Sequence, residues 1–379
     1  MIVEVIFSQI LNEPEKELFY LKGEWGNIIK VACIYMATII GAGFASGQEI
    51  VKFFLTYYTG GFYGILLAGG LFSVIGYIVL DKVYRERIRN YDELVFPMVG
   101  WVLGWVMEIA VTLFMLCLFC VMIAGMGNVV SSQLHLPLNR AIVGVSIVCM
   151  IVMLTDVKGI VTISTFITPV LIVGIVATGL YVIIFKDTSV FNGINFIPSL
   201  TKNWVFSALT YVSYNSIMSM VVMSSLLPYL KSRKVGIVGG IAGGMMLCVI
   251  ALLINTALFL FYPEVLTREL PMLDIVSKYS TTLTRVYTLV LCLAMFVSAI
   301  TSGFYFIERV SSKTKLNIRI LTVILCALVV PLAGFGFSNI ISTVYPIFGY
   351  IGMFMVFAVV LYGIRLRPLG KYLRIKGRG

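Results

Sequence analysis

Three glycines and a carboxylate interrupt an apolar segment near the N-terminus. The run 28–56 contains GAGFASGQE, in which Gly41, Gly43 and Gly47 precede Glu49. A glycine inside a helix costs roughly 1 kcal/mol relative to alanine, and it lets the backbone unwind and approach a ligand closely. N–H groups freed by such a break suit an anion, and freed carbonyls suit a cation. The segment is therefore a candidate binding site within a membrane helix.

A second polar interruption, YVSYNS, runs from Tyr211 to Ser216 within the apolar segment 203–229. Glycine, alanine and serine also form faces for close helix packing in membranes, so the glycines alone leave both interpretations open. Gln48 beside Glu49 and the second interruption together favour a binding site, because paired interruptions in two halves of a chain are typical of transporters.

Charged residues inside apolar segments are also candidates for function. Glu108 lies within the run 98–130, which offers it no basic partner of its own. An unpaired charge at mid-bilayer costs at least about 2.5–3.5 kcal/mol, so we expect Glu108 to face the interior. There it can be protonated, bond to freed backbone or a hydroxyl, or meet a cationic solute. Glu49 and Lys52, one helical turn apart, either pair with each other or form part of an external gate.

The composition predicts an all-α polytopic membrane protein. Hydrophobic residues make up 60% of the 379 residues and charged residues 12%, whereas soluble domains carry about 25% charged residues. Apolar runs of roughly 20 residues recur, and each can cross the bilayer as a helix. Outer-membrane barrels have short alternating segments instead. The ten predicted spans are 28–56, 62–81, 98–130, 140–154, 160–185, 203–229, 235–262, 281–308, 318–335 and 339–364.

The distribution of Lys and Arg predicts the orientation. With a cytoplasmic N-terminus, the inside segments carry 21 of these residues and the outside segments six. Positive residues accumulate on the cytoplasmic side, so both termini are expected in the cytoplasm, in the cytoplasmic membrane of a bacterium. The net charge of +11 follows from this topology and from attraction to anionic lipid. It requires no nucleic-acid partner.

Ten spans divide into two halves of five. An odd number of spans makes the second half enter the membrane from the opposite side, which gives an inverted repeat. The predicted organisation is a cytoplasmic leader (1–26), a first five-helix repeat (27–185), a second (186–364) and a basic cytoplasmic tail (365–379). The residues 263–280, between spans seven and eight, are expected to form a short external helix.

GAGFASGQE and TSGFYFIER make the sequence resemble the LeuT-fold, amino acid–polyamine–cation superfamily, and within it the YkvI-like bacterial membrane proteins. The resemblance covers almost the whole chain. It implies that helices 1 and 6 are broken and that the breaks bind a substrate. The backbone that would hold a substrate carboxylate comprises Gly41, Ala42, Gly43, Phe44 and Ala45. The residues that would meet its amine or side chain are Tyr211, Ser213, Tyr214 and Asn215, with Glu108 as a further candidate.

The same resemblance implies a sodium site between helices 1 and 8. Its oxygens would be the carbonyls of Ala37, Ile40 and Ser298 and the hydroxyls of Thr301 and Ser302. Neutral oxygens suit a hard cation. Alternatively, the hydroxyls only bond back to their own helix. Proton-coupled relatives place a lysine on helix five, and the span 160–185 has none, which favours Na⁺.

The expected function is secondary active transport of a small amino-acid-like or amine solute, coupled to Na⁺. The alternatives are a ligand-sensing subunit of the same fold that does not transport, and a proton-coupled transporter that uses Glu108. An enzyme is disfavoured, because the sequence contains no H-E-x-x-H and no plausible Ser–His pair or paired aspartates within spans. The expected partners are the solute and the bilayer, with Na⁺ as coupling ion, no cofactor, and no particular oligomeric state.

Overall fold

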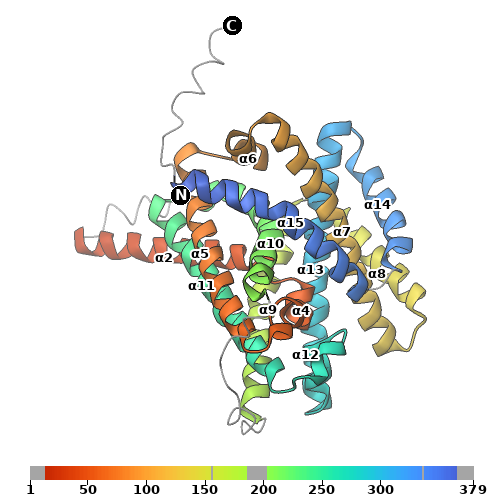
Figure 1. Cartoon of the computed structure of the whole chain (residues 1–379). Coiled ribbons are helices and arrows are strands. Elements are labelled where there is room, and N and C mark those ends of the chain that lie inside the picture. Colours follow the sequence, from red (N-terminus) through yellow and green to blue (C-terminus); the bar gives the residue numbers. More distant parts are fainter. Residues whose placement is uncertain (1–12, 155–156, 186–202, 335–336, 365–379) are drawn as a thin grey trace.

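The computed structural model describes residues 13–154, 157–185, 203–334 and 337–364, which form a bundle of helices without strands in these ranges (Figure 1). A short helix, α6 (Tyr91–Val99), lies at one end of the bundle, and another, α12 (Pro271–Ser277), lies at the opposite end. The long helices between them position the candidate site.

The first predicted span is divided into three helices. They are α2 (Glu13–Ile39), α3 (Ala42–Ser46) and α4 (Gln48–Phe53). Ile40 and Gly41 lie outside the helices. Gly47 has a φ of 82°, a left-handed conformation that glycine adopts at little cost, and it therefore ends α3 and redirects the chain into α4.

The remaining predicted spans each coincide with one helix. The further elements are η1 (Leu55–Tyr57), α5 (Gly60–Glu86), α7 (Trp101–Leu134), α8 (Leu138–Met153), α9 (Val157–Phe185), α10 (Trp204–Ser224), η3 (Leu227–Tyr229), α11 (Arg233–Phe259), η4 (Glu264–Thr267), α13 (Thr281–Thr314), α14 (Ile318–Ala333) and α15 (Phe337–Ile364). Six described helices contain a stretch long and apolar enough to cross a membrane. The chain is therefore a multi-pass membrane protein, while the count of ten crossings remains a prediction.

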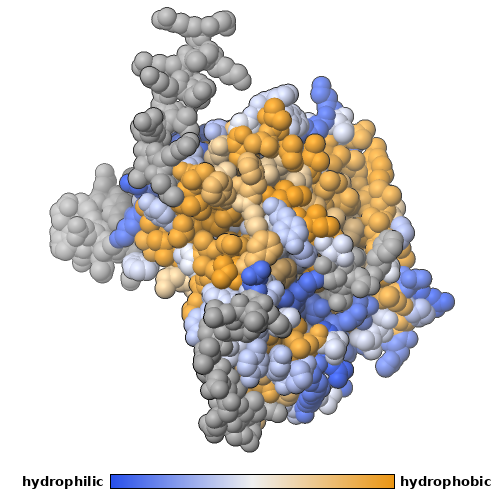
Figure 2. Space-filling view, viewed as in Figure 1, coloured by the Kyte–Doolittle hydropathy of each residue, from blue (hydrophilic) through white to orange (hydrophobic). Residues whose placement is uncertain are grey.

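The outer surface is apolar where the long helices face outward. Figure 2 shows an orange band over this face, with hydrophilic residues gathered towards the α12 end. Exposed apolar side chains include Ile109 on α7, Leu328 on α14 and Phe357 on α15. A continuous apolar band is the surface that hydrocarbon solvates without an energetic penalty.

Helices five positions apart in the predicted order contact each other. The contacting pairs are α2 with α10, α5 with α11, α7 with α13, and α8 with α14. An inverted repeat places equivalent helices around a pseudo-two-fold axis in this way. α10 also contacts α4, α5, α7 and α15, so it lies near the middle of the bundle, beside the candidate site.

The pair α5 and α11 packs backbone against backbone. A Cβ at Gly76 would lie 2.7 Å from the carbonyl oxygen of Gly240, and one at Gly244 would lie 2.3 Å from the nitrogen of Ser73. Small residues permit such an approach in membranes, where packing and hydrogen bonds take over from the hydrophobic effect. The glycine spacing of residues 236–244 is the sequence pattern that indicates this contact. The close packing of the two helices was not predicted from it.

Gly76→Val is expected to destabilise the protein by about 3 kcal/mol, the upper range for overpacking, because the added side chain meets backbone that cannot move alone. Thermal unfolding of the purified protein in detergent measures this loss. Gly70→Val is the matched control, since a Cβ at Gly70 on the same helix meets nothing within 4 Å. An equal loss in both variants would contradict this account of the α5–α11 contact.

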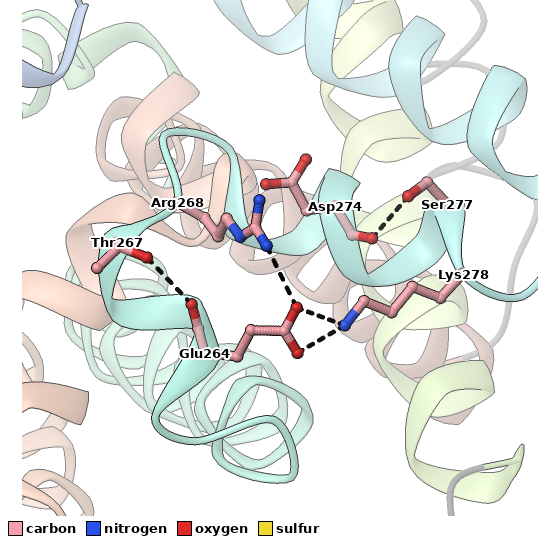
Figure 3. A network of polar contacts seen from close by, with 6 residues as sticks. All are labelled: Glu264, Thr267, Arg268, Asp274, Ser277 and Lys278. Carbon is pink, nitrogen blue, oxygen red and sulfur yellow. Dashed lines mark hydrogen bonds and ion pairs between the residues drawn. The ribbon is translucent and has the colours of Figure 1, made fainter.

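The region 263–280 contains the short helix that the sequence predicted. Glu264 in η4 accepts hydrogen bonds from Lys278 at 2.6 and 2.7 Å and from Arg268 at 3.4 Å (Figure 3). The hydrogen bond from Lys278 is the main reason that the pKa of the Glu264 carboxyl lies below its usual value. This network ties the two ends of the segment together and holds α12 against α3 and α13.

The helix α6 was not predicted. Its first turn carries Asp92 and Glu93, which favour a helix N-terminus. Glu93 accepts a hydrogen bond from the N–H of Arg89 at 2.8 Å, much as an acidic residue does in a capping box. This local pattern was the available signal.

Candidate functional site

The break between α2 and α3 is buried inside the bundle. The N–H of Ala45 bonds to the carbonyl of Gly41 at 2.9 Å, which begins the hydrogen-bond ladder of α3. The N–H groups of the first turn before it have no carbonyl within the helix to bond. All five residues of α3 are buried. Ala42 to Ala45 are helical, so only Ile40 and Gly41 lie outside the helices, and substrate binding by residues 41–45 stays a prediction.

Neighbouring helices hold this broken segment in place. The Tyr287 hydroxyl of α13 donates a hydrogen bond to the carbonyl of Ala45, at the end of α3. The Ser207 hydroxyl of α10 donates to the carbonyl of Phe53, at the end of α4, at 2.7 Å. These bonds satisfy carbonyls that the short helices leave unpaired. The segment after the break is therefore held by α13 at one point and by α10 at another.

Glu49 folds back over the first turn of α3. Its side chain is buried, with 3% of its surface exposed, and the Tyr214 hydroxyl donates a hydrogen bond to its Oε2 at 2.7 Å. A Cβ at Gly43 would lie 2.2 Å from Oε1. Glycine at this position therefore makes room for the carboxylate directly beside the broken backbone.

Tyr214, which bonds to this carboxylate, packs against four other aromatic side chains, and the five come from four helices. The ring centre of Tyr214 lies 4.7 Å from that of Tyr345, 5.5 Å from Phe53, 5.6 Å from Tyr211 and 6.3 Å from Phe114. We call this set the Tyr214 cluster. The Tyr211 hydroxyl is buried and has no hydrogen-bond partner within the described residues. The cluster therefore combines aromatic faces, one carboxylate and one unsatisfied hydroxyl.

The predicted break in helix 6 is wrong, because α10 is helical throughout Tyr211 to Asn215. The Ser213 hydroxyl donates to the carbonyl of Leu209 at 2.6 Å, and the Asn215 amide donates to the carbonyl of Tyr211 at 3.0 Å. Short polar side chains can satisfy their hydrogen-bond donors on the carbonyls of the preceding turn in this manner. Polarity in this segment therefore does not imply unwinding, and of the four predicted residues only Tyr211 and Tyr214 belong to the cluster.

A small cavity adjoins the break between α2 and α3. Phe44 and Tyr211 line it together with residues of α5 and α11. Its water-accessible volume is about 10 Å³, which is close to the smallest space that holds one water molecule. A solute can enter only when side chains around the break move.

The predicted sodium ligands lie on α13 and on the end of α2. A Cβ at Gly41 would lie 3.5 Å from the Ser298 hydroxyl oxygen, so α13 passes directly beside the break. The Ser302 hydroxyl donates to the carbonyl of Ser298 at 2.7 Å, which is the alternative that the sequence left open. Thr301 and Ala37 are half-buried and Ile40 is buried. The hydroxyl oxygen of Ser302 keeps lone pairs that can bind a cation.

Glu108 is buried, as predicted, and its partner lies on another helix. Arg309 on α13 forms an ion pair with it. The guanidinium of Arg309 also lies 4.6 Å from the ring centre of Tyr91 on α6. Within the described residues, the carboxylate of Glu108 thus contacts a side chain and not freed backbone. The ion pair lies towards the α6 end of the bundle. The contact between α7 and α13 brings the pair together.

The sequence left two alternatives open for Glu49 and Lys52, an ion pair and an external gate. The ion pair does not form among the described residues, and the gate stays a prediction. Glu49 turns inward to Tyr214, whereas Lys52 is half-buried on α4 and makes no ion pair with it among the described residues. The physical reason is the αL turn at Gly47, which aims the first residues of α4 back at α3. The inward orientation of Glu49 depends on this turn and on Tyr214, so helical spacing alone did not reveal it.

Two curated proteins of Bacillus subtilis (strain 168) are similar to this chain. The uncharacterized membrane protein YkvI is 27% identical over 342 residues, which cover 88% of this chain and 96% of that protein. The uncharacterized protein YyaD is 27% identical over 342 residues, covering 90% of this chain and 98% of that protein. No family model matches the sequence.

Solved transporter structures resemble the chain in fold. MhsT in complex with L-phenylalanine has a TM-score of 0.64 at 16% identity, over 87% of each chain. A manganese transporter of Eremococcus coleocola has a TM-score of 0.60 at 12% identity, over 90% of this chain and 79% of that chain. A Na⁺-coupled sialic acid symporter has a TM-score of 0.55 at 14% identity, over 89% of this chain and 78% of that chain. The chain therefore has the LeuT fold that these secondary transporters share.

Proposed function

We propose that this protein is a secondary active transporter that moves a small amino-acid-like or amine solute across the cytoplasmic membrane by alternating access. The observation that carries the proposal is the break at Ile40 and Gly41, after which buried Glu49 lies against Gly43 and bonds to Tyr214. Irregular backbone is tolerated at membrane depth only where protein, water or cargo satisfies it. The fold shared with solved transporters supports the same conclusion.

In this proposal, a different set of contacts closes each end of the site. At the α6 end, which we take as cytoplasmic, the Glu108–Arg309 pair links α7 to α13. At the opposite end, α12 contacts α3 and α13. We propose that the halves 27–185 and 186–364 rock against each other, which breaks one closure at a time. In such a motion, the equivalent helices of the two halves move relative to each other.

The proposed coupling ion is Na⁺, bound by the carbonyls of Ala37, Ile40 and Ser298 with the hydroxyls of Thr301 and Ser302. The proximity of Ser298 to Gly41 supports this assignment. Replacing both Thr301 and Ser302 by alanine is expected to abolish stabilisation by Na⁺ while the protein still folds, because two of five ligands are lost. Thermal unfolding in NaCl against equimolar choline chloride measures the effect. A double variant that responds to Na⁺ like the parent would contradict the assignment.

The experiment that tests the proposed function is a thermal stability screen of the purified protein. It compares amino acids, amines and other small solutes with and without Na⁺. A transporter is expected to be stabilised by a restricted set of solutes, because ligand that binds only the folded state raises its stability. A response to no solute would argue against the proposal, and a response that depends on pH but not on Na⁺ would favour proton coupling.

A further inference from the structure

We propose that the transported solute is an organic amine without a carboxylate, and that Glu49 binds its ammonium group within the Tyr214 cluster. This inference rests on the proposed function and makes its substrate class specific. The chemical groups beside the broken helix are the carboxylate of Glu49, the five aromatic rings of the Tyr214 cluster and the unsatisfied hydroxyl of Tyr211.

The first argument is charge. Glu49 is buried, and within the described residues its hydrogen-bond partner is the neutral hydroxyl of Tyr214. A buried carboxylate is stable when a cation pairs with it, and it is costly when none does. The described residues supply Glu49 with no such cation, because Lys52 makes no ion pair with it. An ammonium group on the solute supplies the missing charge.

The second argument is the aromatic surround. Tyr214 contacts the rings of Phe53, Tyr211 and Tyr345 at centre distances between 4.7 and 5.6 Å. Aromatic faces attract organic cations, most strongly where the cation is desolvated. The Tyr211 hydroxyl, which is buried without a partner, is free to accept a hydrogen bond from an ammonium N–H.

The third argument is the exclusion of a carboxylate. Oε1 of Glu49 lies so close to Gly43 that no side chain fits between them. The backbone at Gly43 is therefore covered by a carboxylate of the protein itself. The carboxylate of an amino acid bound there would meet the like charge of Glu49, and such repulsion selects against a ligand. A decarboxylated amine avoids this repulsion.

The test compares each amine with the amino acid that differs from it only by the α-carboxylate. The pairs are phenethylamine with phenylalanine, isoamylamine with leucine, and tryptamine with tryptophan. Dissociation constants come from calorimetric titration of the purified protein. At least one amine is expected to bind tenfold or more tightly than its amino acid. Amino acids that bind as tightly as their amines in every pair would overturn the inference.

Glu49→Gln is expected to weaken amine binding by at least about tenfold, since a buried charged partner is lost. Glu308→Gln, which removes an exposed carboxylate from α13, is the matched control and is expected to bind like the parent. Parent-like amine binding by Glu49→Gln would overturn the inference. If that variant does not fold, the comparison of amine with amino acid in the parent still decides.

The outcome also separates this inference from the proposed function. If no amine binds but a solute that is not an amine is accumulated by the reconstituted protein, the amine assignment fails and the transport function stands. If no solute of any class binds or is accumulated, both fail.

Discussion

Arg309→Met is expected to destabilise the protein by about 3–5 kcal/mol, the range for removing one partner of a buried ion pair. The side chain of Arg309 is 13% exposed and that of Glu108 is 6% exposed, so water cannot replace the lost cation. Tyr91 would lose its contact with the guanidinium at the same time. Thermal and denaturant unfolding of the purified protein measure the loss.

The double variant Glu108→Gln with Arg309→Met tests the physical reason. It removes both charges, so it is expected to recover most of the stability that the single variant loses. Glu308→Gln on the same helix serves as control, because Glu308 is exposed and its replacement is expected to change stability by less than about 0.5 kcal/mol. If the double variant is no more stable than Arg309→Met, charge pairing is not the reason for the destabilisation.

Gly43→Ala is expected to reduce solute affinity by at least about tenfold, the order for losing a buried charged partner of the ligand. The new methyl group would lie 2.2 Å from Oε1 of Glu49, so the carboxylate must move away from the break and from Tyr214. The protein is expected to remain folded, because the displaced atoms are the far end of a side chain. Calorimetric titration with the best solute from the stability screen measures the affinity.

The matched control for this variant is Gly70→Ala, where a Cβ meets nothing within 4 Å. It is expected to bind solute like the parent. Parent-like affinity in Gly43→Ala would show that Glu49 is not a determinant of solute binding. A loss of affinity in both variants would instead indicate a general effect on the fold.

Features that depend on local sequence were predictable. The spans follow from hydropathy, and the interruption of the first span follows from Gly41, Gly43 and Gly47, because glycine weakens a helix wherever it lies. The short helix within residues 263–280 was also predictable from the local sequence. The polar segment of α10 shows the limit of this reasoning, since Ser213 and Asn215 bond to their own helix and leave it continuous.

Features that depend on distant residues were not predictable from one sequence. Glu108 and Arg309 are 201 positions apart, and Tyr214 is 165 positions from Glu49. Each partner lies on a helix whose neighbours only the fold determines. The inverted-repeat hypothesis pairs helices 3 and 8, which contain Glu108 and Arg309, so it contained the signal for that ion pair. The same hypothesis pairs helices 1 and 6, which contain Glu49 and Tyr214, but it did not predict their hydrogen bond, because the backbone at Gly47 turns α4 inward.

The most direct test of the central claim is uptake of a labelled solute into vesicles reconstituted with the purified protein. The solute is the tightest ligand from the stability screen, and an inward Na⁺ gradient is imposed at constant pH. The proposal predicts that the parent accumulates the solute above its external concentration and that Gly43→Ala does not. A solute that binds the purified protein tightly but never enters the vesicles would contradict transport, and it would identify the protein as a ligand-sensing subunit of the same fold.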